Sequence, residues 1–74
     1  MRIQNTLGNN VKKLREAKKW SQEELAEQTG LHRTYVSGVE RGIRNPTVQI
    51  VEDLANALNT TASKLMDEKG EDAE

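Results

Sequence analysis

Four consecutive polar side chains, residues 32–35 (His-Arg-Thr-Tyr), begin a segment in which Val36 and Val39 follow at helical spacing. They offer an imidazole, a guanidinium fork and two hydroxyls, which are groups that hydrogen-bond to the edges of nucleic-acid bases. A helix that only supports a core has no need of so many such groups in its first turn. The alternative interpretation is an ordinary solvated helix face.

The patterns of enzymes are missing from the sequence. Its five glycines stand apart and form no phosphate-binding loop, and neighbouring acids such as Glu23 and Glu24 fall on predicted helix surfaces. His32 is the single imidazole and Cys is absent, so a structural zinc site lacks ligands. We therefore expect no catalysis, no metal and no cofactor.

Composition and charge divide the 74 residues into two parts. Residues 67–74 hold five acids and one base, which leaves residues 1–66 with a net charge of +3 although the whole chain carries −1. We expect a folded domain over 1–66 and an acidic flexible tail over 67–74, either simply solvated or competing with a nucleic acid for the basic body. No apolar run exceeds three residues, so we expect neither a membrane span nor a secretory signal, and a cytoplasmic location.

Helical spacing and capping residues predict five helices and no strand. The sequence Ser-Gln-Glu-Glu at 21–24 is a capping box, and Gly30 and Asn59 are suited to left-handed helix ends. Thr47 and Thr61 are expected to cap the fourth and fifth helices. The predicted helices are residues 6–19, 22–28, 32–40, a fourth that begins after Thr47, and a short last one that ends at 65–66. The fold class is therefore a compact all-α domain.

The segment 21–42 has the form of a helix-turn-helix, in which the second helix enters the major groove of DNA. Residues 21–26, 30–42 and 44–47 also resemble the XRE-type, phage-repressor-like helix-turn-helix family, and 33–42 is most similar to the controller proteins of restriction–modification systems. The resemblance covers roughly residues 7–66. It implies the five-helix, lambda-repressor-like fold.

The resemblance also implies roles for individual side chains. Arg33 would grip guanine, whose O6 and N7 atoms match a guanidinium fork. Gly38 leaves a bare position where some relatives carry a reading glutamine, so DNA shape would contribute to recognition. The implied base contacts are Arg33, Thr34, Tyr35 and Ser37, and the implied phosphate contacts are Gln22, Arg41, Arg44 and Asn45.

Two further pairs of residues receive structural roles. Arg15 and Glu40 match a buried ion pair of the relatives, with a phosphate contact as the alternative for Arg15. Leu65 and Met66 end the ordered body and are expected at the centre of a dimer interface. The alternative is that both pack within their own chain.

The sequence therefore predicts a regulator of transcription that binds double-stranded DNA as a homodimer on a pseudo-palindromic operator. No small-molecule effector and no membrane partner are expected. The competing hypothesis is an antitoxin-type or other protein-interaction module with the same fold. Because Trp20 and Tyr35 are the only aromatic residues, single-stranded nucleic acid is disfavoured as a ligand.

Overall fold

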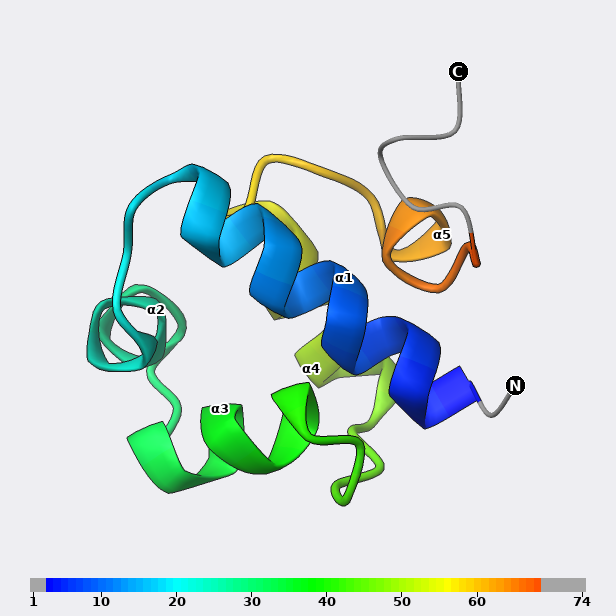
Figure 1. Cartoon of the computed structure of the whole chain (residues 1–74), viewed down its shortest axis with the longest axis horizontal. Coiled ribbons are helices and arrows are strands. Elements are labelled where there is room, and N and C mark those ends of the chain that lie inside the picture. Colours follow the sequence, from blue (N-terminus) through cyan, green and yellow to red (C-terminus); the bar gives the residue numbers. More distant parts are fainter. Residues whose placement is uncertain (1–2, 69–74) are drawn as a thin grey trace.

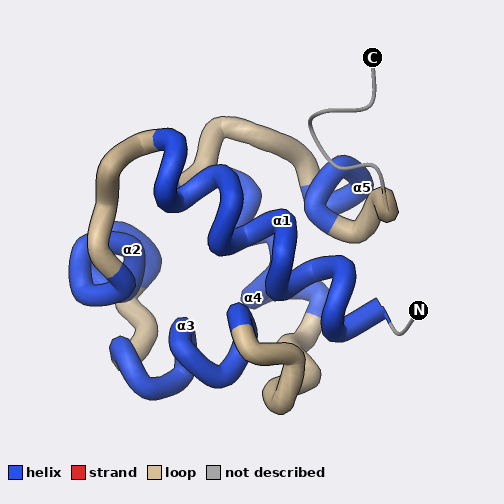
Figure 2. Tube along the Cα trace, in the orientation of Figure 1, coloured by secondary structure: helices blue, strands red, loops and turns tan. Residues whose placement is uncertain are grey.

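The computed structural model describes residues 3–68, which form five helices around one core and contain no strand (Figures 1 and 2). This confirms the all-α, five-helix fold class. No helix within this part of the chain has the length and hydrophobicity to cross a membrane. Most of the predicted acidic tail, residues 69–74, lies outside the described residues. The helices are α1 (Ile3–Ala17), α2 (Gln22–Thr29), α3 (Arg33–Glu40), α4 (Val48–Ala57) and α5 (Ala62–Leu65).

Helix α2 begins and ends at the residues that its sequence indicates. The hydroxyl of Ser21 accepts a hydrogen bond from the backbone amide of Glu24 at 3.0 Å. At the other end Gly30 has a φ of 77°, a left-handed conformation that is easy only for glycine, and its amide donates to the carbonyl of Ala26. These two caps set the length of α2 and the direction in which the chain leaves it.

The last two helices are capped in the same way. Thr47 accepts from the amide of Ile50 at 3.2 Å, and Thr61 accepts from the amide of Lys64 at 3.1 Å. Asn59 has a φ of 59°, so the left-handed end predicted there is confirmed. Short polar side chains thus fix the boundaries of α4 and α5.

Helix α1 differs from its prediction at both ends, spanning Ile3–Ala17 in place of 6–19. The spacing of Leu7 and Val11 extends back by one turn to Ile3, which supports the earlier start. At the other end Lys19 takes a left-handed φ of 62°, which turns the chain before Trp20. A lysine gives no sequence signal for such a turn.

The core is formed where α1 crosses in front of α4, with α3 below and α5 at the side opposite α2 (Figure 1). Burying each large aliphatic side chain contributes roughly 1.5–3 kcal/mol to folding. All five helices contribute to the core, whose most deeply buried large side chains are Val11, Leu25, Val36, Val39, Leu54 and Leu65.

Leu65 is one of these core residues, which corrects the expectation that it forms the centre of a dimer interface. Its exposed fraction within the single chain is 0%. Helix α1 covers this end of the core, and the side-chain amide of Asn10 donates to the carbonyls of Leu65 at 2.7 Å and Asp67 at 2.8 Å. Met66 differs, because it is 40% exposed and remains accessible to a partner.

Candidate nucleic-acid interface

Helices α2 and α3 cross steeply, since α2 is seen nearly end-on where α3 lies across the view (Figure 1). The buried side chains of Val36 and Val39 fix the rotation of α3 about its axis. As a result Arg33 and Thr34 are exposed on the side of α3 that faces away from the core. The arrangement presents one end of a short, rigid helix to solvent.

The other sequence-predicted side chains lie on or beside the same helix. Tyr35 and Ser37 are half-buried at the edges of the exposed surface of α3. Arg41 is exposed directly after the helix, and Asn45 is exposed in the loop that follows. One face of α3 and its flanks therefore bring these residues together.

Behind this face, Arg15 and Glu40 form a buried ion pair between α1 and α3. The guanidinium donates to the carboxylate through Nε at 2.6 Å and Nη2 at 3.1 Å, and Nη1 donates to the carbonyl of Trp20 at 2.7 Å. The side chains of the pair are 10% and 3% exposed. The hydrogen bond to Glu40 raises the pKa of Arg15 above its usual range, against the opposing effect of burial. Arg15 is thus turned inward and stays charged.

Gln22 connects the ion pair with the exposed end of α3. Its Nε2 donates to Glu40 at 3.0 Å, and its Oε1 accepts from Nη1 of Arg33 at 3.4 Å. Since a carboxylate only accepts hydrogen bonds, Glu40 fixes which side of the amide faces Arg33. The amide nitrogen still has a second hydrogen to offer to a phosphate. No local sequence pattern indicates this bridge.

Arg44 lies over the opposite end of the helix. The central carbon of its guanidinium is 5.6 Å from the centre of the Tyr35 ring, a cation–π distance. A Cβ atom added to Gly38 would be 2.6 Å from Cγ of Arg44. The bare position at Gly38 is therefore filled by a side chain from the next loop, which sequence spacing alone does not reveal.

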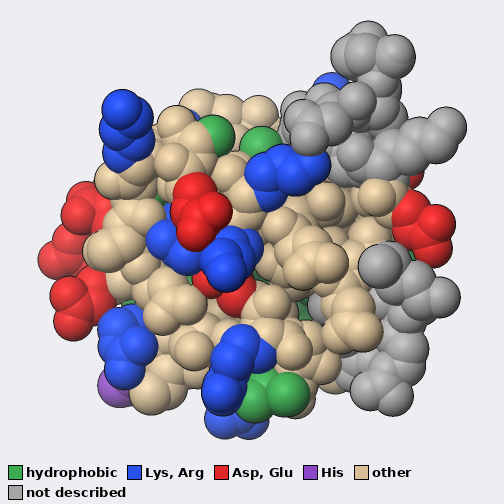
Figure 3. Space-filling view, viewed as in Figure 1, with side chains coloured by type: hydrophobic (Ala, Val, Ile, Leu, Met, Phe, Trp, Pro, Cys, Tyr) green, Lys and Arg blue, Asp and Glu red, His purple; other side chains and the backbone are tan. Residues whose placement is uncertain are grey.

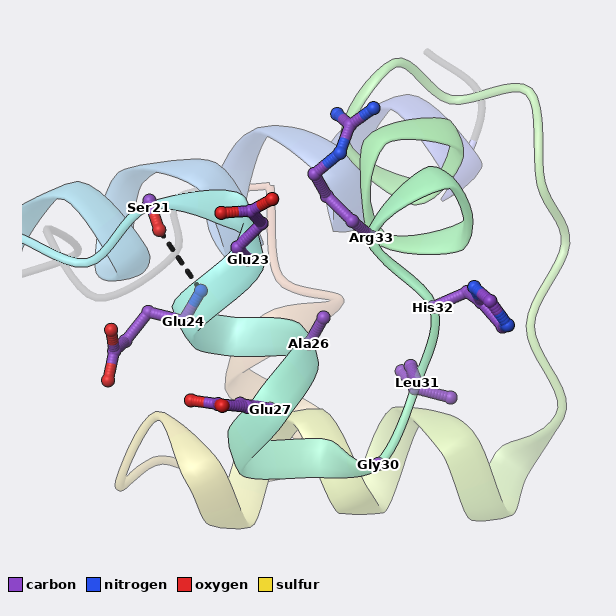
Figure 4. Close-up of a pocket in the computed structure, with 9 residues that line it drawn as sticks. All are labelled: Ser21, Glu23, Glu24, Ala26, Glu27, Gly30, Leu31, His32 and Arg33. Carbon is purple, nitrogen blue, oxygen red and sulfur yellow. Dashed lines mark hydrogen bonds between the residues drawn. The ribbon is translucent and has the colours of Figure 1, made fainter.

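An open hollow of about 680 Å³ lies between α2 and the start of α3 (Figure 4). The side chains of Glu24 and Glu27 point to one side of it, and that of His32 points to the other. His32 is at the N-cap position of α3 but makes no capping hydrogen bond with its side chain. Among residues 3–68 no cluster of three or more His or acidic residues could hold a metal ion. The acidic and imidazole side chains therefore do not converge on one point in the hollow.

Charge is distributed unevenly over the visible face (Figure 3). Acidic side chains gather at the edge formed by α2, where Glu23 and Glu24 occupy the first turn. Lys and Arg side chains lie over α1 and at the lower edge, below α3. A polyanion approaching α3 from below therefore meets the basic edge and not the acidic one.

Comparison with protein families gives a match over most of the chain. Residues 11–65 match the family model described as "Helix-turn-helix". The sequence is 47% identical over 70 residues to the control protein C.SmaI of Serratia marcescens, covering 95% of this chain and 83% of that protein. It spans only 57% and 60% of two longer relatives that it also matches.

Solved structures of controller proteins share the fold. The restriction–modification controller C.AhdI of Aeromonas hydrophila superposes with a TM-score of 0.80 at 44% identity, over 84% of this chain and 94% of that one. The controller C.Esp1396I, solved as a tetramer in complex with its natural 35 base-pair operator, gives a TM-score of 0.78 at 32% identity. That match covers 88% of this chain and 86% of the other.

Proposed function

Because this chain belongs to the XRE-type helix-turn-helix family of DNA-binding transcriptional regulators, we propose that it is a restriction–modification controller that reads its operator with α3. The observation that carries the proposal is the exposed position of Arg33 at the start of α3. Its helix is fixed by buried valines, and its guanidinium is hydrogen-bonded to Gln22, which is itself held by Glu40. The similarity to C.SmaI and C.AhdI supports the controller role.

The proposed contacts fall into two classes with different consequences. Base edges are read from the exposed surface of α3, where Arg33 takes a guanine and Thr34 offers a hydroxyl and a methyl group. Phosphate contacts flank this surface and fix the register of the helix in the groove without reading sequence. In the first class we place Arg33, Thr34, Tyr35 and Ser37, and in the second Gln22, Arg41, Arg44 and Asn45.

We propose that the DNA-bound form in the cytoplasm is a homodimer on a pseudo-palindromic operator. One helix as short as α3 reads few base pairs, and a two-fold pair doubles the site. The operator complex of C.Esp1396I, a tetramer, supports assembly of several copies on DNA. Met66, exposed after α5, remains the proposed interface residue. Sedimentation of Met66→Asp tests this, because loss of the dimer with an unchanged fold is expected. A dimer that persists would place the interface elsewhere.

The proposed reading function is tested by selecting bound duplexes from a random pool and then titrating the selected duplex with Arg33→Ala. We expect specific binding to weaken by about 1–3 kcal/mol and preference at one guanine in each half-site to relax. A random duplex serves as the control and should lose much less affinity. Equal loss on both duplexes would reduce Arg33 to a phosphate contact. Failure to enrich any sequence would favour the protein-interaction alternative.

A further inference from the structure

Gly38 is buried although it lies on the outward side of α3. Thr34 and Arg41 are its neighbours on that side, at the helical spacings of four and three residues. The atoms that cover it belong to Arg44. A Cβ built on Gly38 would be 2.6 Å from Cγ, 3.3 Å from Nε and 3.5 Å from Cδ of that side chain. The stem of Arg44 therefore runs along the space that a side chain at position 38 would occupy.

The backbone brings Arg44 to this place. The carbonyl of Gly38 accepts hydrogen bonds from the amide of Ile43 at 3.0 Å and from the amide of Arg44 at 3.3 Å. The chain is thus folded back against the end of α3, and the side chain of Arg44 starts directly over Gly38. Its guanidinium then reaches the ring of Tyr35, one helical turn earlier.

We propose that Gly38 is a positioning residue for Arg44, one that lets this arginine reach DNA from the surface of the recognition helix. The inference rests on the proposed function, in which Arg44 contacts a phosphate. Because Gly38 has no side chain, the stem of Arg44 can lie across α3 at this position. The carbonyl of Gly38 holds the backbone at the start of Arg44, and the ring of Tyr35 contacts its guanidinium. Arg44 thus supplies the side chain that α3 lacks at position 38.

The physical properties of glycine allow this role to be separated from a merely structural one. Glycine in the interior of a helix is less favourable than alanine, so Gly38→Ala helps α3 itself. The new methyl group, however, strikes Cγ of Arg44, which is close to the backbone and cannot move aside without a change of rotamer. The side chain of Arg44 must then leave the space above position 38. The same substitution favours the fold and removes the arginine from its position.

The experiment compares Gly38→Ala, Arg44→Ala and the double variant in the full chain. Affinity for the selected duplex and for a random duplex is measured across a salt series, and Tm is measured by circular dichroism. We expect each single variant to bind both duplexes about tenfold more weakly. Each should also flatten the salt slope by about one unit. The double variant should bind no more weakly than either single one, whereas independent effects would multiply to about a hundredfold.

Thermal stability provides the second readout. In the Arg44→Ala background, where the methyl group meets no stem, Gly38→Ala should raise Tm by about 4–8 °C. In the otherwise unchanged chain Tm should not fall. A fall in Tm together with weaker binding would make Gly38 a structural glycine and overturn the inference.

The remaining outcomes distinguish failure of the inference from failure of the proposed function. If Arg44→Ala binds weakly and Gly38→Ala binds normally, the positioning role is wrong and the DNA contact of Arg44 stands. Multiplicative losses would also overturn the positioning role, because Gly38 would then act without Arg44. If neither variant changes binding while Arg33→Ala does, Arg44 has no DNA contact and the inference falls with it.

Discussion

The two ends of α3 hold an arginine in different ways. At the N-terminal end, Arg33 is connected through Gln22 to the buried carboxylate of Glu40, which is paired with Arg15. Arg44, which follows the C-terminal end, lies in the space above Gly38 and reaches back to the ring of Tyr35 in the first turn. A chain of hydrogen bonds positions the first arginine, and packing positions the second.

This difference determines which functions can be changed without loss of the fold. The hydrogen bonds from Arg33 through Gln22 end at the buried ion pair of Arg15 and Glu40. Leaving one charge of such a pair buried without its partner lowers the free energy of unfolding. A contact between an exposed cation and an aromatic ring contributes about 0.5–1 kcal/mol. Removing Glu40 therefore affects folding stability as well as Gln22, whereas removing the contact between Arg44 and Tyr35 changes stability little.

The largest expected effect comes from removing the carboxylate of Glu40, the buried end of the hydrogen bonds that run through Gln22 to Arg33. Glu40→Ala leaves the guanidinium of Arg15 buried and without its acid, so we expect the free energy of unfolding to fall by about 3–5 kcal/mol. Equilibrium urea unfolding at a fixed protein concentration measures the change. A loss below about 1 kcal/mol would mean that the ion pair is effectively solvated.

A matched control replaces both charges. Arg15→Met combined with Glu40→Leu leaves no unpaired charge and keeps side chains of similar volume. This double variant should be far more stable than Glu40→Ala. It should nevertheless bind the operator less well than the unchanged chain, because Gln22 has lost the acceptor that orients its amide.

A smaller effect is expected from the link itself. Gln22→Ala removes the bridge between Glu40 and Arg33, and a double-mutant cycle with Arg33→Ala should give a coupling of about 0.5–1 kcal/mol in operator binding. On random duplex the loss for Gln22→Ala should equal that of one neutral phosphate contact, with an unchanged salt slope. Strict additivity on the operator would restrict Gln22 to the phosphate.

An effect of similar size is expected at Tyr35, whose ring supports Arg44. Tyr35→Leu keeps an apolar group against the core but removes the ring, so operator affinity should fall by about 0.5–1 kcal/mol with little change in stability. Tyr35→Phe retains the ring and tests the hydroxyl alone. If Tyr35→Phe binds the operator as weakly as Tyr35→Leu does, the contribution of Tyr35 comes from its hydroxyl and not from the contact of its ring with Arg44.

The sequence predicts this fold well wherever a local rule applies. The cap at Ser21 and the left-handed residues Gly30 and Asn59 are confirmed because each signal lies within one turn of the structure that it sets. The prediction fails at Lys19, whose left-handed backbone no lysine would indicate. It also fails at Leu65, which was expected in a dimer interface but is buried in its own chain. Asn10 of helix α1, which covers Leu65, is more than 50 residues away in sequence, so no local pattern indicates the contact.

The candidate interface shows the same limit. The outward position of Arg33 and Thr34 follows from the helical spacing of Val36 and Val39, which sequence alone supplies. Two features depend on tertiary structure, namely the bridge through Gln22 and the filling of the space at Gly38 by Arg44. Both join residues that only the folded chain brings together.

The amide of Asn10 has a consequence for synthesis of the protein on the ribosome. It donates hydrogen bonds to the backbone carbonyls of Leu65 and Asp67, which are more than 50 residues later in the chain. These contacts lie at the end of the core that the side chain of Leu65 fills. A nascent chain that lacks residues 62–67 has made α1, α2 and α3 but leaves this end of its core exposed to water. Closure must wait until residue 67 has emerged from the exit tunnel. Helix α3 packs against α1 and α2, so the recognition surface is supported before this end of the core closes.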